Sequence, residues 1–180
     1  IRDLLPQADP AVHLAEDHWM ERAEIDDVAD VVALPGAKEL LASVPQAQFA
    51  VVTSATRALA EVRLRAAGLW QHTAHLVTAS DILHGKPHPE PYEKGAAAIQ
   101  LAPQVCVVIE DAPSGTRSGK AAGARVLAIR TTTPDEPLLA AGADWIVNDC
   151  SSLRVSTPSS TGQLALEFST DEPPRVPKMR

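Results

Sequence analysis

The segment Val105–Gly123, with the sequence VCVVIEDAPSGTRSGKAAG, constrains the fold of this chain more than any other. It opens with the apolar run Val105–Ile109, whose length and β-branched composition are typical of a strand buried on both faces. Two adjacent carboxylates, Glu110 and Asp111, follow this run. A Pro-Ser-Gly turn comes next, in which Ser114 is a candidate N-cap for a helix that the final glycine ends. The segment therefore predicts a strand, a turn and a helix in succession.

The two acids are predicted to lie at the carboxyl end of a buried strand, where open α/β sheets bind their ligands. Neighbouring like charges repel each other unless a positive group neutralises them. A hard cation with oxygen ligands, most simply Mg²⁺, would do so, with Asp111 and Glu110 as the candidate ligands. A solvated acidic turn without a ligand is an equally open reading of these two residues alone.

Apolar runs alternate with helical segments along the chain, which predicts βαβ units and a parallel sheet. Further strands are expected at 49–53, 74–78, 125–129 and 144–147, and helices near 56–67, 92–100 and 138–141. Residues 1–33 are expected to form short helices, with a start signal at Asp9-Pro10. A tail is expected from about residue 156, with a possible edge strand at 163–168.

Composition excludes some classes of function. The formal net charge of -7 argues against a nucleic-acid or polyanion partner, and no apolar run approaches the length of a membrane-spanning helix. Two cysteines give no disulfide framework, so a reducing, cytoplasmic location is expected. The six histidines show no metal-ligand spacing and are expected at surface positions. Because the chain begins with Ile1 in an apolar-polar pattern, we expect an N-terminal truncation.

Other strand ends add groups that suit an anion. Thr53 and Ser54 follow an apolar run and present hydroxyls at the predicted sheet edge; they would also serve to cap the next helix. Lys86 lies between Gly85 and Pro87, in a loop stiffened by two prolines, although a lone loop lysine is most often a solvated charge. Hydroxyls, a lysine and two acids at successive strand ends suit phosphoryl transfer with a Mg²⁺ site.

With these segments, the chain resembles the haloacid dehalogenase-like superfamily. Within that superfamily it is most similar to small sugar- and polyol-phosphate phosphatases that have a helical cap. Examples of this type are glycerol-3-phosphate and 2-deoxyglucose-6-phosphate phosphatases. The likeness covers about residues 1–155 and rests on an ordered set of short motifs. They are LPGA from Leu34, VVTSAT from Val51, GKPHPEPY from Gly85, IEDAPSG from Ile109 and GKAAG from Gly119.

The resemblance implies a Rossmann-like α/β core at 34–155 and the end of an α-helical cap at 1–33. The polar composition of residues 156–180 separately predicts a flexible tail. The resemblance further implies that Ser54, or else Thr53, binds the phosphoryl group and that Lys86 neutralises it and the nucleophile. Asp111 and Glu110 would hold Mg²⁺, with Ser114 as a possible support. The implied partner is a small phosphorylated metabolite; the oligomeric state stays open.

One departure from the family is serious. The family's nucleophile lies in an Asp-x-Asp-Gly-Thr motif at the end of the first strand, upstream of the cap, and this chain has no such motif. Asp26-Asp27 lacks both the preceding strand and the following Gly-Thr, so we interpret it as cap surface. The missing strand would lie between the strands that end at Ser54 and Glu110, which leaves two unpaired edges.

Two functions therefore compete. The first is a piece of a Mg²⁺-dependent phosphatase that forms an aspartyl-phosphate in the complete protein, with this chain alone inactive. The second is a non-catalytic remnant of the same fold with a binding or scaffolding role. A dinucleotide-binding module is disfavoured because no Gly-x-Gly-x-x-Gly follows a strand.

Overall fold

The structure is a computed structural model that describes residues 7–156 and 164–169. In chain order its α-helices and strands are α1 (Pro10–Asp26), α2 (Ala37–Ser43), β1 (Val51–Val52), α3 (Arg57–Ala66), β2 (Leu76–Val77), α4 (Glu90–Ala98), β3 (Val107–Glu110), α5 (Pro113–Ala121), β4 (Arg125–Ile129), α6 (Asp135–Ala140), β5 (Trp145–Val147), β6 (Leu153–Ser156) and β7 (Ala165–Phe168). Short 3-10 helices lie at Gln46–Gln48, Trp70–His72, Ala79–Asp81, Pro103–Val105 and Cys150–Ser152.

The predicted α/β class is confirmed, with parallel strands flanked by helices. The parallel strands form two sheets: β1 pairs with β2, and β3, β4 and β5 pair in that order. Within the described residues, β1 and β3 each pair with one strand only, so the expected unpaired edges are present. The possible edge strand near the C-terminal end is confirmed as β7, which pairs antiparallel with β6.

The core is centred on β4, because this strand has neighbours on both sides and helices above and below. Val126, Leu127 and Ala128 have no exposed surface. Leu127 packs in a cluster with Leu40 of α2 and with other buried side chains. That cluster is completed by Ile129, Val147, Cys150 and Leu153.

Burial of β3 on both faces was predicted and is wrong. Val108 and Glu110 are buried, whereas Val107 and Ile109 keep 43% and 38% of their surface exposed. The buried face lies against α5, where Gly119 allows a close approach to Val108. The other face is left partly open by the elements that the structure describes, which explains the alternation.

Helix boundaries follow local chemistry, with two corrections. Ser114 is not an N-cap: α5 begins at Pro113, and the N-cap is Ala112, because proline suits the first helical position. Residues 10–26 form one helix rather than several short ones, capped as expected by the Asp9 side chain, which accepts from Ala11 N at 2.8 Å. Gly123 ends α5 with a φ of 86°, as predicted.

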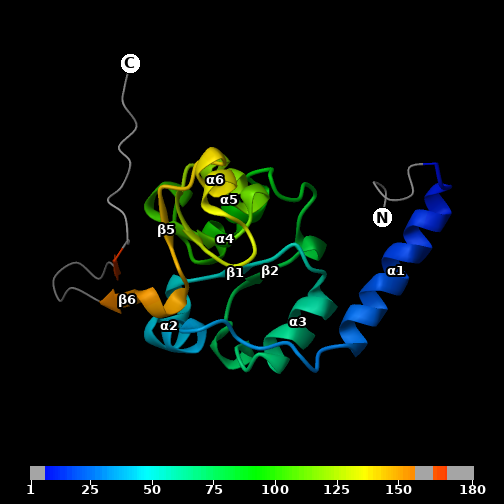
Figure 1. The fold of residues 1–180 in the computed structure, drawn as a ribbon, viewed down its shortest axis with the longest axis horizontal. Helices are drawn as coiled ribbons and strands as arrows, with labels where there is room; N and C mark the ends of the chain where they lie inside the picture. Colours follow the sequence, from blue (N-terminus) through cyan, green and yellow to red (C-terminus); the bar gives the residue numbers. More distant parts are fainter. Residues whose placement is uncertain (1–6, 157–163, 170–180) are drawn as a thin grey trace, which may run out of the picture.

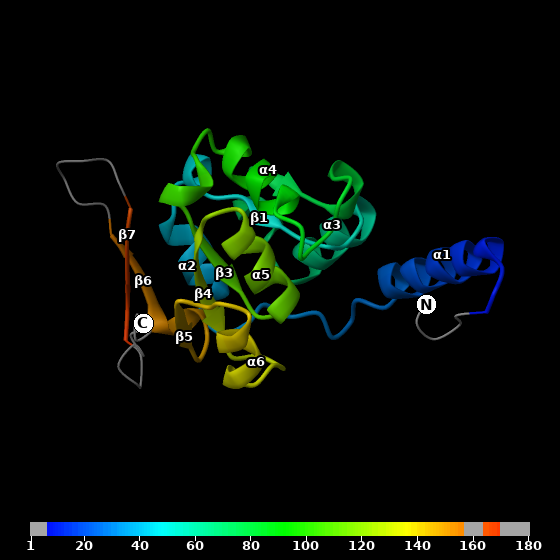
Figure 2. The same cartoon turned by 90° about the horizontal axis from the view of Figure 1, so that it is seen from above.

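Figures 1 and 2 show the parallel sheets and their helices in the middle of the molecule. Helix α1 lies at one end, where it contacts α3, and the β6–β7 hairpin lies at the opposite end. Among the described helices, none combines the length and the apolarity that crossing a membrane requires.

Candidate active site

Lys86 and Glu110 form a buried ion pair between the ends of two strands. The Lys86 ammonium donates to Glu110 Oε1 and, at 3.4 Å, to the carbonyl oxygen of Val52 at the end of β1. Only 11% of the lysine side chain and 7% of the glutamate side chain are exposed. The structure thus brings Lys86 to the carboxyl ends of β1 and β3, which belong to different sheets.

The Glu110 carboxylate is occupied on both oxygens. Oε1 also accepts from the Tyr92 hydroxyl at 2.6 Å, and Oε2 accepts from the backbone N–H groups of Asp111 at 2.9 Å and Ala112 at 3.1 Å. Burial acts to raise the pKa of Glu110, but the charge and hydrogen bond of Lys86, together with the other donors, hold it below its ordinary value. Glu110 is therefore ionised and fixed at neutral pH.

Tyr92 is a site residue that the sequence analysis missed. Burial raises the pKa of its hydroxyl, and the adjacent Glu110 charge raises it further, so Tyr92 stays a hydrogen-bond donor. The Lys86 ammonium lies 4.9 Å from the centre of its ring, which adds a cation–π contact. The available signal was the position of the chain's one tyrosine, directly after the rigid Lys86 loop.

Asp111 is the exposed member of the acid pair. Its Oδ2 accepts from Thr131 Oγ1 at 2.9 Å, and the residue is exposed to solvent. A carboxylate has about four acceptor positions, so one hydrogen bond leaves room for a hard cation. Asp111 is therefore suited to be a Mg²⁺ ligand. Glu110 could bind the same ion only if its carboxylate gave up one of its four present hydrogen bonds.

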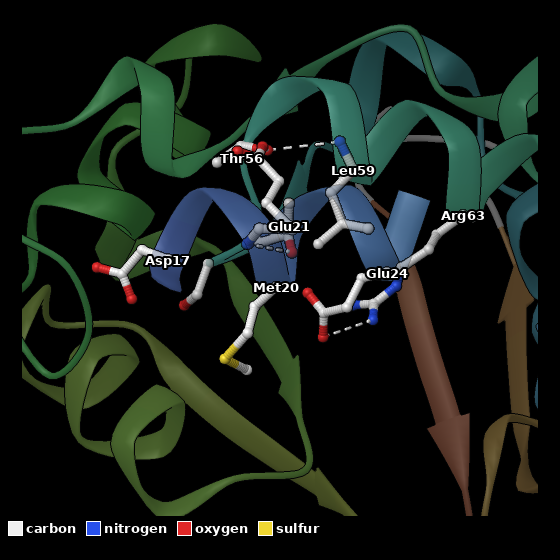
Figure 3. A pocket seen from close by; sticks show the side chains of 10 residues that line it. Asp17, Met20, Glu21, Glu24, Thr56, Leu59 and Arg63 are labelled. Atoms are coloured by element: carbon white, nitrogen blue, oxygen red, sulfur yellow. Dashed lines mark hydrogen bonds and ion pairs between the residues drawn. The ribbon is translucent and has the colours of Figure 1, made fainter. Parts of the chain in front are cut away.

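Thr53 and Ser54 line a cavity of about 480 Å³ between α1 and α3 (Figure 3). Thr53 Oγ1 accepts from Ala55 N at 3.1 Å, so its hydroxyl shapes the turn. Thr56 caps α3, and its side chain accepts from Leu59 N at 3.4 Å. Ser54 lines the cavity two residues before Thr56, close in sequence to the N-terminus of α3, where anions are favoured.

Acidic residues of α1 form the opposite wall of this cavity. Asp17, Glu21 and Glu24 lie on one face of the helix because their spacing is four and then three residues. Glu21 accepts a hydrogen bond from Thr56 Oγ1, and Glu24 pairs with Arg63 at 3.3 Å (Figure 3). The sequence analysis missed this wall, although the spacing was visible in the sequence.

Ser114 and the acid pair Asp26-Asp27 take no part in the contacts described above for Lys86, Glu110 and the cavity. Ser114 lies in the first turn of α5, three residues after Asp111, and its supporting role stays a prediction. Asp27 is the C-cap of α1 and, like Asp26, is exposed, as expected for a surface acid pair.

Known proteins resemble this chain over most of its length. A family model for haloacid dehalogenase-like hydrolases matches residues 6–129. Hexitol phosphatase A of Escherichia coli (strain K12) is 42% identical over 127 residues, which are 69% of this chain and 58% of that protein. Glycerol-1-phosphate phosphohydrolase 2 of Saccharomyces cerevisiae is 37% identical over 134 residues, 69% of this chain and 53% of that one. The chain therefore spans little more than half the length of these relatives.

Solved structures agree with the sequence relatives. A haloacid dehalogenase family hydrolase from Deinococcus radiodurans R1, with bound phosphate and sodium, has a TM-score of 0.61 and 29% identity, covering 67% of this chain and 56% of that one. A hydrolase from Entamoeba histolytica, covering 83% of this chain and 71% of that one, has a TM-score of 0.74 at 20% identity and supports the fold alone. The family model and the sequence relatives show that this chain belongs to the haloacid dehalogenase-like hydrolases.

Proposed function

We propose that this chain forms part of a Mg²⁺-dependent phosphatase that hydrolyses phosphate monoesters of small sugars or polyols. The observation that carries the proposal is the buried Lys86 ammonium, held by Glu110 between the ends of β1 and β3. A buried ammonium with one fixed carboxylate partner provides a preorganised positive charge for an anion. Relatives that act on hexitol phosphates and glycerol-1-phosphate support the substrate class.

In this proposal the phosphoryl group binds at the turn after β1. The Ser54 hydroxyl, or else that of Thr53, donates to a phosphate oxygen, and the N-terminus of α3 adds favourable backbone dipoles. Lys86 neutralises the charge that builds up on the phosphoryl oxygens and on the attacking carboxylate. Glu110 and Tyr92 keep the ammonium in place, because both contact it inside the protein.

Asp111 is proposed as the Mg²⁺ ligand, with Glu110 beside it as the second predicted ligand. When bound, the cation would screen charge on the phosphoryl group and orient it. Asp111 presents its carboxylate at the carboxyl end of β3, and Thr131 fixes one of its oxygens at 2.9 Å. Ser114, in the turn that follows, is proposed to support this arrangement.

The nucleophile is proposed to be an aspartate outside this sequence, because the chain has no Asp-x-Asp-Gly-Thr motif. Its own residues can bind and orient a phosphate but cannot attack it, so we expect no turnover by the chain alone. Helix α1 is proposed to be part of the substrate-selecting cap. Its carboxylates along the cavity are suitable acceptors for the hydroxyl groups of a sugar or polyol. A cytoplasmic location stays a prediction.

The test compares Asp111→Asn with Lys86→Ala in the complete protein, measuring phosphatase rate against Mg²⁺ concentration. Asp111→Asn should chiefly weaken Mg²⁺ binding, so high Mg²⁺ should restore much of the rate. Lys86→Ala should lower the rate at every Mg²⁺ concentration, by about 100-fold if one positioned charge contributes about 3 kcal/mol. Arg125→Ala, on the exposed start of β4, is the control. Equal rescue of both variants, or of neither, would contradict these roles.

A further inference from the structure

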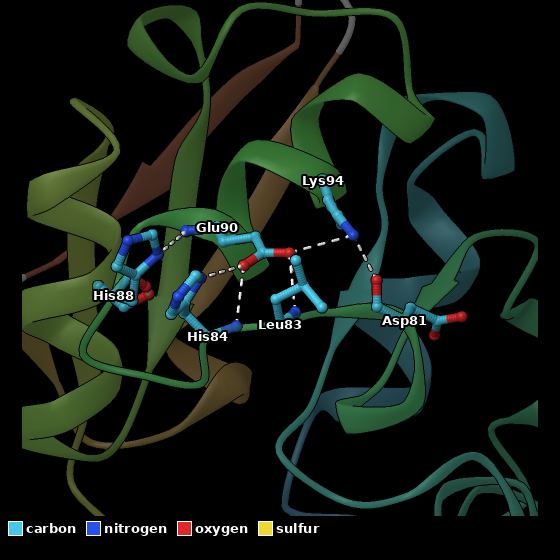
Figure 4. Close-up of polar contacts among 7 residues, drawn as sticks. Asp81, Leu83, His84, His88, Glu90 and Lys94 are labelled. Carbon is cyan, nitrogen blue, oxygen red and sulfur yellow. Dashed lines mark hydrogen bonds and ion pairs between the residues drawn. The ribbon is translucent and has the colours of Figure 1, made fainter.

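The loop that carries Lys86 brings two imidazoles and a carboxylate together on the surface (Figure 4). His84, His88 and Glu90 each offer one possible ligand atom, and these three atoms lie within 4.8 Å of one another. His84 Nδ1 is 3.1 Å from Glu90 Oε2, and the two imidazole rings are 4.5 Å apart between centres. The sequence pattern did not reveal this cluster, because its ligands come together only through the turn of the loop.

The structure assigns a transition-metal site to His84, His88 and Glu90, suited to Zn²⁺. Zinc–nitrogen bonds of about 2.0–2.1 Å place two ligands of a tetrahedral ion roughly 3.3 Å apart. The separation between His84 Nδ1 and Glu90 Oε2 already matches this. Two imidazole nitrogens and one carboxylate oxygen leave a fourth position for water, and imidazole favours zinc over the hard ion Mg²⁺.

The backbone of the loop is held before any metal arrives. His88 N–H donates to Gly85 O at 3.0 Å, and His88 O accepts from Ser118 Oγ of α5 at 2.6 Å. Glu90 begins α4, and its two carboxylate oxygens accept from the backbone N–H groups of Leu83 and His84, both at 2.9 Å. A metal would therefore bind to groups whose backbones are already ordered, which lowers the entropy cost of binding.

Metal binding exchanges few existing contacts. A cation between His84 Nδ1 and Glu90 Oε2 takes the place of their present 3.1 Å contact, with the neutral imidazole binding through Nδ1. The exposed His88 ring gives up one hydrogen bond of 3.2 Å, in which its Nδ1 accepts from Glu90 N.

The site lies close to the proposed catalytic lysine in sequence, because Lys86 stands between the two histidines. A bound ion would tie both ends of the Lys86 loop to the start of α4. The ligand set nevertheless differs from that of the proposed Mg²⁺ site, which consists of carboxylates at the end of β3. Zinc binding at His84, His88 and Glu90 therefore does not depend on the proposed phosphatase activity.

The test uses the full 180-residue chain after chelation, titrated with ZnCl₂ by calorimetry in the presence of excess MgCl₂. We expect one Zn²⁺ per chain with micromolar affinity, and a tenfold or greater loss for His84→Ala and for His88→Ala. His75→Ala and Cys106→Ser are the matched controls and should bind as the parent does. In NMR spectra of the unmutated chain, the imidazole resonances of His84 and His88 should shift with Zn²⁺.

Zinc binding that is unchanged in His84→Ala and His88→Ala would overturn the assignment. So would a titration without saturable binding, or one that Cys106→Ser abolishes. If a histidine variant fails to fold, the NMR experiment on the unmutated chain still decides, because imidazole resonances that stay in place show that neither ring binds the metal.

Discussion

Gly115 decides whether Glu110 can occupy its buried position, and Gly115→Ala tests this directly. A Cβ added at Gly115 would lie 1.9 Å from Glu110 Oε1 and 2.0 Å from its Cδ, far below any contact distance between real atoms. The alanine variant must therefore displace the carboxylate. This leaves the Tyr92 hydroxyl without its acceptor and the Lys86 ammonium without its counter-ion.

The expected change in the free energy of unfolding of Gly115→Ala is the sum of two opposing effects. Breaking a buried ion pair costs about 3–5 kcal/mol, because the charge left behind is desolvated. Alanine within a helix stabilises it by about 1 kcal/mol relative to glycine. The free energy of unfolding should therefore fall by about 2–4 kcal/mol. Gly85→Ala is the control: a Cβ added there would meet no atom within 4 Å, and we expect a change within about 0.5 kcal/mol.

Urea unfolding followed by circular dichroism measures both variants. The decisive step repeats Gly115→Ala in a Glu110→Ala background, where the obstructing carboxylate is absent. There the substitution should be neutral or should stabilise the protein by up to about 1 kcal/mol. If Gly115→Ala destabilised both backgrounds equally, the cost would come from the α5 backbone, and the reasoning about Glu110 would be refuted.

Two further predictions concern single contacts. Tyr92→Phe removes only the hydroxyl that donates to Glu110 at 2.6 Å, and should lower the free energy of unfolding in urea by about 1.5–3 kcal/mol; unchanged stability would show that this bond contributes nothing. The pKa of Asp81 is lowered to about 2, chiefly by the Thr78 hydroxyl and N–H and also by Arg57, so its stabilisation is complete above pH 4 and lost towards pH 2. Asp81→Asn should lower Tm at pH 7, with the difference closing by pH 2; a constant difference would contradict this.

Local chemistry made much of the fold predictable. Asp9 caps α1 as expected, because a side-chain oxygen satisfies a free N–H group at a helix start. The cap of α3 is Thr56 rather than Thr53 or Ser54, so the chemistry of the cap was expected but its position was wrong. Gly68 and Gly142 adopt φ values of 69° and 102° after helices that were expected to end there. The bounds of β4 coincide with the apolar run from which that strand was predicted.

The parts that sequence reasoning missed depend on tertiary contacts. The rule that places ligands at strand ends found Lys86 and Glu110, but it could not show that Glu110 turns inward to Lys86 and Tyr92. That orientation depends on the space above Gly115, which is a property of the packed helix. The exposed face of β3 was missed for a related reason: an apolar run indicates a strand, but burial depends on which elements cover it.

The division of the parallel strands into two sheets has a consequence for cooperative unfolding. Strands in one sheet open together because they share a hydrogen-bonded ladder, but within the described residues no ladder joins β1–β2 to β3–β5. The connection runs instead through α4, which contacts β1, β2 and α5, and through the charge pair of Lys86 and Glu110. In native-state hydrogen exchange, the amides of β1 and β2 should therefore exchange at a lower opening free energy than those of β4. Discharging either member of the pair should widen that difference, because helix packing and one buried ion pair then have to join the two sheets without a shared ladder.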